Sequence, residues 1–413
     1  MPLFSPIKST LLCWVLIVLS CGQRVPLSTS ERNDAHKDST VHITVGANRI
    51  PVYQEYIEKK RVGIVANQTS VIFTSQPHTD TSFVHLVDSL SSLQVDIKRV
   101  FSPEHGFRGT ADAGEKVTDG KDERTGIPIV SLYGSQRKPS QEHLADLDVV
   151  IFDIQDVGVR FYTYIATLQY VMEACAEAGI PILVLDRPNP NGHYVDGPTM
   201  ELENRSFLGL NAIPLVYGMT IGEYALMING EQWLENGVKA DLTVIELENY
   251  THQGNYSLPI RPSPNLPNDK AINLYPSLGL FEGTHINAGR GTDFQFQRFG
   301  SPYHDSTLFK FRYTPKPNFG SKSPKFNGEI CFGEDLSTTP FMKEMSLQWV
   351  IKAYKESASK DDFFNTSGFT KHAGTSILQQ QIVAGWDETQ IKESWAGSLE
   401  TFKEIRKKYL IYP

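Results

Sequence analysis

The chain has 413 residues, of which 40% are hydrophobic, and a formal net charge of −8. This length exceeds that of an ordinary single domain, so two domains are expected. The sequence has no low-complexity tract and no helical repeat, which excludes disordered and solenoid proteins. The mildly acidic balance excludes the basic surface with which proteins bind nucleic acids.

The N-terminus has the pattern of an export signal. Lys8 precedes a short apolar run that cannot span a bilayer, so residues 1–21 are expected to be a secretory signal peptide. Residues 18–21 resemble the lipobox of bacterial lipoproteins, in which Cys21 carries the lipid; simple cleavage is the alternative. Residues 22–40 are polar and predict a flexible tether. The expected product is a periplasmic or outer-membrane-associated lipoprotein that meets a membrane only through its lipid.

Short apolar strands alternate with amphipathic helices over residues 41–240, the expected first domain. The helix at 164–178, for example, has apolar residues at helical spacing and stops before Gly179 and Pro181. This alternation predicts an α/β fold with a Rossmann-like, mostly parallel, doubly wound sheet. The expected strands are 41–45, 61–69, 95–101, 127–134, 148–153 and 181–185, and the other expected helices are 51–60 and 85–93.

Polar side chains follow four of these strands in succession. The carboxyl ends of parallel strands meet at one edge of a sheet, and ligands of open α/β proteins bind at that edge. Single polar strand ends are ordinary, but four in Gly- and Pro-rich settings favour a functional site. The residues concerned are Asn67, Glu104, His105, Asp153, Asp156, Asp186 and Arg187.

Glu104 is the leading candidate for a catalytic group. Pro103 ends the strand at 95–101, and a Gly-rich loop that follows leads to a second carboxylate, Glu115. Two carboxylates brought together in this way can do general acid/base work on a sugar or an ester. The alternative is that Glu104 caps local backbone groups and Glu115 is a solvated loop residue.

From residue 241 the pattern changes to that of a smaller α+β domain, 241–413, with a cleft expected between the two domains. Its second polar, Gly-dense loop spans 280–293. The expected strands are 242–245 and 328–332, and the expected helices are 346–355, 376–384 and 394–408.

Several cofactor and nucleophile patterns are missing from the sequence. No G-x-G-x-x-G follows the first strand, so no nucleotide cofactor is expected, and no G-x-S-x-G marks a serine hydrolase. No Cys-x-x-Cys or zinc spacing occurs, and no metal site is expected. Cys175 and Cys331 are expected to be buried free thiols, with a disulfide as the alternative.

Six groups of motifs together resemble the exo-β-N-acetylmuramidase family of peptidoglycan hexosaminidases, in the family's order over about residues 45–413. The resemblance implies a Rossmann-like domain that needs no nucleotide, a smaller C-terminal domain, and removal of N-acetylmuramic acid from the non-reducing end of peptidoglycan fragments. The expected partners are therefore muramic-acid-terminated saccharides or muropeptides. The motifs lie at 63–69, 101–106, 153–158 with 160–164, 186–190, 263–265, and 281–284 with 289–292.

The resemblance and the local chemistry together suggest roles for individual residues. Glu104 is the expected catalytic carboxylate, and Glu115 and Asp156 compete with Asp153 for a second catalytic role. The muramic acid lactyl group is a carboxylate, for which a fork-shaped arginine is the natural partner. The arginine candidates, each of which could instead hold the two domains together, are Arg160, Arg187 and Arg290. The other expected substrate contacts are Asn67, His105, Asp153, Tyr162, Asp186, Glu282 and His285.

Three mechanisms and two other functions stay open at this point. The separation of the catalytic carboxylates decides between inversion and retention, whereas a substrate-assisted route through the sugar's N-acetyl group needs one acid and an orienting residue. Two positions depart from the family pattern: His285 stands where many relatives have Asn, and residues 294–297 replace a Pro-Phe-Glu-like segment. Both departures are expected to alter substrate contacts and to leave the reaction class unchanged. A non-catalytic muropeptide-binding lipoprotein is the main alternative function. A metal-dependent hydrolase would use His105 and His285 with Asp153 and Asp156, which lack zinc spacing.

Overall fold

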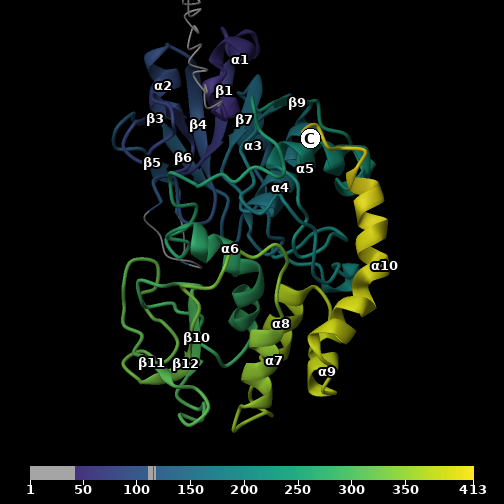
Figure 1. The fold of residues 1–413 in the computed structure, drawn as a ribbon. Coiled ribbons are helices and arrows are strands. Elements are labelled where there is room, and N and C mark those ends of the chain that lie inside the picture. The colour runs from purple at the N-terminus through teal and green to yellow at the C-terminus, as the bar shows by residue number, and fades with distance from the viewer. Residues whose placement is uncertain (1–41, 110–114, 116–117) are drawn as a thin grey trace, which may run out of the picture. The chain divides into compact units, whose positions relative to one another are not determined.

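The large sheet is built around β1 (Arg61–Ala66), in which every residue but the first is buried. β1 pairs in parallel with β4 (Asp96–Ser102) on one side and with β7 (Val149–Asp153) on the other. The direction in which the chain adds strands therefore reverses at β1, which makes β1 the topological switch point of a doubly wound sheet. The computed structural model confirms the expected Rossmann-like, mostly parallel sheet (Figure 1).

Seven strands form this sheet, in the order β5-β6-β4-β1-β7-β8-β9. Its other members are β5 (Gly120–Lys121), β6 (Pro128–Ser131), β8 (Ile182–Leu185) and β9 (Leu242–Ile245). All neighbouring strands are parallel except β5 and β6, which are antiparallel. Because β9 pairs with β8, the sheet continues past residue 240, near which the domain boundary is expected.

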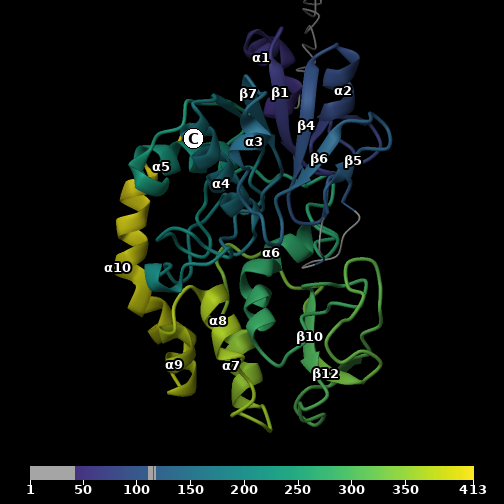
Figure 2. The ribbon, with the colours of Figure 1, turned by 180° about the vertical axis from the view of Figure 1, so that it is seen from behind.

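Alternate residues of the strands pack into two hydrophobic clusters, one on each face of the sheet. Ile64 and Ile151 belong to the cluster that contains buried residues of α1 and α2, whereas Val65 and Phe152 belong to the cluster that contains α4 and α5 (Figures 1 and 2). The second cluster continues into the C-terminal half. The helices of this half are α1 (Ile50–Ile57), α2 (Leu86–Ser92), α3 (Gln141–Leu144), α4 (Tyr164–Ala178) and α5 (Ile221–Gly230).

The C-terminal half carries a separate antiparallel sheet with the order β10-β12-β11, which confirms the expected smaller α+β domain (Figure 1). Its strands are β10 (Arg298–Ser301), β11 (Phe311–Tyr313) and β12 (Cys331–Asp335), and its helices are α6 (Asp269–Leu278), α7 (Gln348–Lys355), α8 (Thr366–Ala373), α9 (Ile377–Val383) and α10 (Glu388–Arg406). α10 runs alongside both halves (Figure 2). Its Arg406 donates through Nε to the Gly218 carbonyl at 3.0 Å and so ties the C-terminus back to the first half.

A short hairpin and four 3-10 turns complete the described elements. Several expectations differ from what the structure contains. Residues 41–45 form no strand in the described chain, because Thr44 makes only an isolated bridge with Glu248. α6 was not among the expected helices, and it contains Pro276, although proline in a helix interior usually kinks or breaks the helix. The remaining elements are β2 (Val71–Phe73), β3 (Phe83–His85), η1 (Gly46–Asn48), η2 (Leu202–Asn204), η3 (Glu235–Gly237) and η4 (Gly279–Gly283).

The structure describes residues 42–109, 115 and 118–413. The expected signal peptide (1–21) with its lipidated Cys21, and the tether (22–40), lie outside the described residues. Within the described part, no helix is both long and apolar enough to cross a membrane. Cys175 and Cys331 are buried free thiols, as expected, and burial raises the pKa of each to about 12.

Candidate functional site

A cavity of about 290 Å³ lies where the carboxyl edge of the large sheet meets the C-terminal half. This volume is close to the lower end of small-molecule sites, roughly 300 to 1,000 Å³. The first half of the chain contributes Glu104, His105, Tyr133, Tyr162 and Thr163 to its wall. The second half contributes Ser263, Tyr275, Glu282, Arg290 and His372. The cavity is thus formed by both halves, beside the switch point of the sheet.

The carboxylate of Glu104 is held on the cavity wall by two hydroxyl groups. Glu104 follows β4, and its Oε2 accepts a hydrogen bond from Thr163 Oγ1 at 2.8 Å. The Tyr133 hydroxyl also hydrogen-bonds to Glu104, and burial together with the Glu104 charge raises the pKa of Tyr133. Thr163 is the N-cap residue of α4 but makes no side-chain cap bond, so its hydroxyl serves Glu104 instead. The Glu104 carboxylate therefore has a fixed orientation in the cavity.

His105 joins the Glu104 loop to the connector between the two halves. Its Nε2 lies 3.1 Å from the Ser263 Oγ, and both residues are buried. Its φ of 71° is in the left-handed region, which non-glycine residues rarely adopt and which costs on the order of 1–3 kcal/mol. Tyr162 reaches the same connector, because its hydroxyl donates to the Pro262 carbonyl at 2.6 Å. These contacts fix the floor of the cavity.

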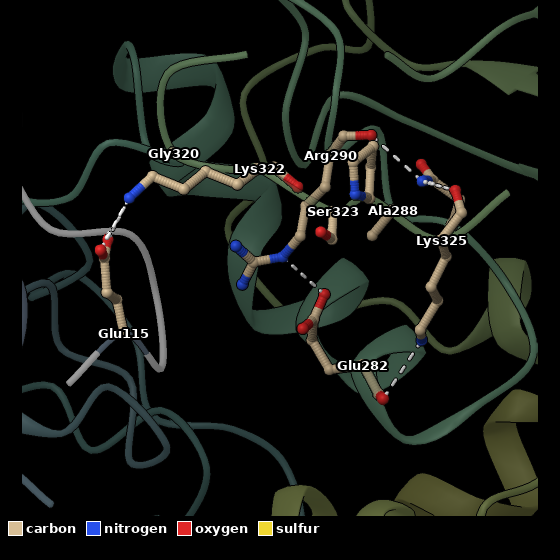
Figure 3. Close-up of a pocket in the computed structure, with 11 residues that line it drawn as sticks. Glu115, Glu282, Ala288, Arg290, Gly320, Lys322, Ser323 and Lys325 are labelled. Atoms are coloured by element: carbon tan, nitrogen blue, oxygen red, sulfur yellow. Dashed lines mark hydrogen bonds and ion pairs between the residues drawn. The ribbon is translucent and has the colours of Figure 1, made fainter. Parts of the chain in front are cut away.

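Glu282 and Arg290 form an ion pair on the opposite wall, with Arg290 Nε 3.0 Å from Glu282 Oε1. Burial alone would raise the pKa of Glu282, but the charges of Arg290 and Lys325 lower it to about 2. Glu282 is therefore an ionised acceptor near neutral pH and not a proton donor. Among the described residues, none accepts a hydrogen bond from the two Nη atoms of Arg290, a residue that also lines a second cavity (Figure 3).

The second cavity adjoins the first through Glu282 and Arg290 and has a volume of about 500 Å³ (Figure 3). Glu115 lines this second cavity, where its carboxylate pairs with the Lys322 ammonium at 2.7 Å. Glu115 does not line the Glu104 cavity. Glu104 and Glu115, which were expected to work together, thus line two neighbouring cavities.

Asp153 and Arg187 form a buried ion pair behind the site. Arg187 Nε and Nη2 donate to the two carboxylate oxygens of Asp153 at 2.6 and 2.9 Å. Arg187 also donates to the Val71 carbonyl at 2.9 Å. Neither residue lines the Glu104 cavity. Their contacts join β7 and the loop after β8 to β2, which is a structural role.

Asp186 and Asn67 are likewise turned into the protein. Asp186 accepts hydrogen bonds from Tyr412 at 2.6 Å and from Thr220 at 2.7 Å, and burial raises the pKa of Asp186 to about 7. Asn67 has no exposed surface, and its Oδ1 accepts from the backbone and side chain of Thr69 at 2.8 and 2.6 Å. Both side chains close turns at the sheet edge and lie outside the cavity lining.

Asp156 and Arg160 lie in the layer beneath the cavity and do not line it. Asp156 accepts from the Tyr217 hydroxyl and from the Gly158 N–H, and burial raises the pKa of Asp156 to about 7. Arg160 has no carboxylate partner in the described chain and donates instead to backbone carbonyl groups. His285 is exposed on the C-terminal half, stacked near Tyr303 with ring centroids 6.1 Å apart.

The residues of the metal hypothesis do not gather into a ligand set. His105 lies in the cavity wall and His285 is exposed, whereas the two aspartates are bound in the separate networks described above. In the described part of the chain, the one group with metal-like spacing is Glu173, Glu177 and Glu235. The Lys138 ammonium occupies it, at 2.7 Å from both Glu173 and Glu177.

Comparison with known proteins identifies the family. The chain matches the model "Exo-beta-N-acetylmuramidase NamZ, N-terminal" over residues 62–270 and the corresponding C-terminal model over residues 273–412. The chain belongs to the exo-β-N-acetylmuramidase NamZ family. It is also similar to the peptidoglycan β-N-acetylmuramidase NamZ of Bacillus subtilis, with 39% identity over 88% of this chain and 89% of that protein.

Two solved structures share the NamZ-family fold. Both are crystal structures of DUF1343 family proteins from Bacteroides fragilis. The first has a TM-score of 0.81 and 42% identity and covers 90% of this chain and 99% of its own. The second has a TM-score of 0.74 and 28% identity with the same coverage of both chains. The likeness therefore extends over both halves of the molecule.

Several cavity residues of this NamZ-family chain were not among the predicted site residues, and Tyr133, Thr163 and His372 are the ones that matter for the chemistry. Tyr133 follows β6 at the same sheet edge as Glu104, so the strand-end rule could have found it. Thr163 precedes a helix, where a cap bond is the ordinary expectation for threonine. His372 lies near the end of α8, and no local pattern connects it with a site at the large sheet.

Proposed function

We propose that the chain is an exo-acting glycoside hydrolase that releases N-acetylmuramic acid from the non-reducing end of peptidoglycan fragments, with Glu104 as its acid/base group. One observation carries the proposal: in a chain of this family, the Glu104 carboxylate is held by Thr163 and Tyr133 on the wall of a cavity of about 290 Å³. Glycosidic cleavage needs a proton on the leaving oxygen, which a positioned carboxyl group supplies.

The surroundings of Glu104 favour the substrate-assisted route. The other carboxylate of this cavity, Glu282, is ionised and engaged by Arg290, and Asp153 and Asp156 are bound elsewhere. In this route the N-acetyl oxygen attacks C1 while Glu104 protonates the departing oxygen. Water then opens the cyclic intermediate at C1, and Glu104 takes up the proton that the water releases. One carboxyl group serves both steps.

Arg290 is suited to recognise the lactyl carboxylate of muramic acid. Its Nε is engaged by Glu282 (Figure 3), and Arg290 lines both cavities and so marks their junction. A guanidinium presents two parallel N–H groups to a carboxylate, which an ammonium group cannot do. A sugar ring seated beside Glu104 would place its C3 substituent towards this junction.

Arg290→Lys should therefore weaken binding of N-acetylmuramic acid by roughly tenfold or more, since charge-assisted hydrogen bonds contribute about 1.5–3 kcal/mol. Binding of N-acetylglucosamine, which lacks the lactyl group, should change little. Isothermal titration with the two sugars gives the ratio of dissociation constants. Arg312→Lys, at an exposed arginine of β11, is the matched control. An equal loss for both sugars would remove Arg290 from lactyl recognition.

We further propose that the chain is exported and anchored through lipid on Cys21. The sequence pattern of residues 1–21 supports this placement, which would bring the site to peptidoglycan fragments outside the cytoplasm. Muropeptide binding without turnover is the alternative function.

The direct test is incubation of the purified protein with the disaccharide N-acetylmuramyl-N-acetylglucosamine and with reduced peptidoglycan fragments. The expected products are free N-acetylmuramic acid and a fragment shortened by one sugar, identified by mass spectrometry. Release from internal positions would contradict an exo action. Binding of the disaccharide without any cleavage would instead establish the non-catalytic alternative.

A further inference from the structure

His372 brings a basic nitrogen to the Glu104 cavity from the C-terminal half. It lies in the last turn of α8, and its Nδ1 is 2.9 Å from the Gly368 carbonyl of the same helix. A carbonyl only accepts hydrogen bonds, so Nδ1 carries the hydrogen and Nε2 has the lone pair. Among the described residues, none forms a hydrogen bond with Nε2. Because Nδ1 faces the helix backbone, we infer that the ring edge with Nε2 faces the cavity that His372 lines.

The surroundings of His372 keep the imidazole neutral. Burial lowers its pKa, and the positive charges of Lys325 and Arg290 act in the same direction. The Gly368 carbonyl and the Glu282 carboxylate oppose this shift without reversing it. Near neutral pH, His372 therefore offers a hydrogen-bond acceptor at Nε2 and not a second positive charge beside Arg290.

Arg160 fixes the backbone that carries this imidazole. Its Nη2 donates to the His372 and Ala373 carbonyls at 3.1 and 2.6 Å, and its Nη1 is bound to two carbonyls of the first half. Gly374 makes room for this contact, because a Cβ there would lie 2.5 Å from Arg160 Nη2. The next residue after Arg160, Phe161, packs against the His372 ring with centroids 5.4 Å apart.

We propose that His372 is the orienting residue of the reaction: its Nε2 accepts a hydrogen bond from the N–H of the sugar's 2-acetamido group, and so directs the acetamido oxygen to C1. This role rests on the proposed function. Glu104 and His372 belong to different halves of the chain and line one cavity. A sugar between them would meet the proton donor through its leaving oxygen and His372 through its 2-substituent. Arg160 is a positioning residue for this contact.

Two substitutions separate this role from a structural one. An asparagine amide can replace Nδ1 in the bond to Gly368 but does not reach the position of Nε2, whereas a glutamine amide reaches it. His372→Asn should lower kcat for hydrolysis of a chromogenic N-acetylmuramide by about 30-fold or more with little change in KM, and His372→Gln should recover part of the loss. His304→Asn is the matched control, because His304 also bonds a carbonyl through Nδ1, at 2.9 Å, but lies outside the cavity.

The outcomes are distinct. Undiminished kcat in His372→Asn, or an equal loss in His372→Asn and His304→Asn, would overturn the role of His372 while leaving the proposed function intact. No hydrolysis by the wild type would overturn both. A readout without substitution is the histidine ¹⁵N spectrum of the wild type, in which one Nε2 signal should shift on addition of N-acetylmuramic acid but not of its 2-deoxy analogue. The decisive control is the 2-deoxy analogue, which has no N–H at C2, because the 2-amino analogue could still donate to Nε2; an equal shift with N-acetylmuramic acid and with its 2-deoxy analogue would contradict the acetamido contact.

Discussion

Glu104→Gln is expected to lower kcat/KM for N-acetylmuramyl-N-acetylglucosamine by roughly 1,000-fold, within the range that general acid catalysis contributes. Glutamine keeps the size of the side chain and can still contact Thr163 and Tyr133, but it has no proton to give to a sugar leaving group. The loss should appear in kcat, because the variant retains the shape of the cavity. Steady-state kinetics with the disaccharide measure this loss of kcat, with the release of N-acetylmuramic acid as the readout.

The leaving group provides an internal control for this variant. Dinitrophenolate leaves a glycoside without being protonated. With a dinitrophenyl glycoside, Glu104→Gln should therefore retain far more of the wild-type rate of bond cleavage than it does with the disaccharide. Glu142→Gln, at an exposed residue of α3, should match the wild type on both substrates. If Glu104→Gln lost the same factor on both glycosides, Glu104 would not be the group that protonates the leaving oxygen.

Arg160→Met is expected to lower the free energy of unfolding by about 3 kcal/mol, because four backbone carbonyls would lose their donors in the protein interior. Part of this loss is offset, since the guanidinium is buried, has no counter-ion among residues 42–109, 115 and 118–413, and has a pKa that burial lowers to about 9. Urea unfolding with an unchanged m value measures the effect. Arg160→Lys keeps the charge but cannot reach all four carbonyls, so it should be destabilised as well.

The control for Arg160→Met is the same substitution at Arg61, an arginine on the surface. Arg61 pairs with Asp148 through two hydrogen bonds, at 3.0 and 2.7 Å, but the pair is open to solvent. Arg61→Met should therefore change the unfolding midpoint much less than Arg160→Met. Equal midpoints for the two variants would show that the carbonyl contacts of Arg160 contribute little. Because Arg160 also holds His372, its variants should lose activity at temperatures well below their unfolding transition.

The parts of the fold that local patterns determine were predictable from the sequence. α4 has the expected bounds and β1 has the expected first residue, because each combines an unbroken hydrophobic pattern with a clear terminal residue. For α4 this terminus is Gly179, which adopts φ 67°. Glu104 follows β4 and lies on a cavity wall at the carboxyl edge of the sheet, the edge at which ligands of open α/β proteins bind.

The direction of the other strand-end side chains was not predictable, because distant partners decide it. Asp186 is turned inward by Thr220 and by Tyr412, which is 226 residues away in the sequence. Arg187 is turned inward by Asp153, 34 residues away. His372 enters the site from the far end of the chain through helix packing, and α8 contains no pattern that marks it. Sequence therefore indicates which edge of the sheet carries a site, while the tertiary contacts select its members.

A crystal structure of Glu104→Gln with N-acetylmuramyl-N-acetylglucosamine bound tests the central claim most directly. We expect the muramic acid ring in the Glu104 cavity, with the glycosidic oxygen within hydrogen-bond reach of the amide at position 104 and the lactyl carboxylate on Arg290. A disaccharide bound elsewhere, or one whose glycosidic oxygen faces away from position 104, would contradict it.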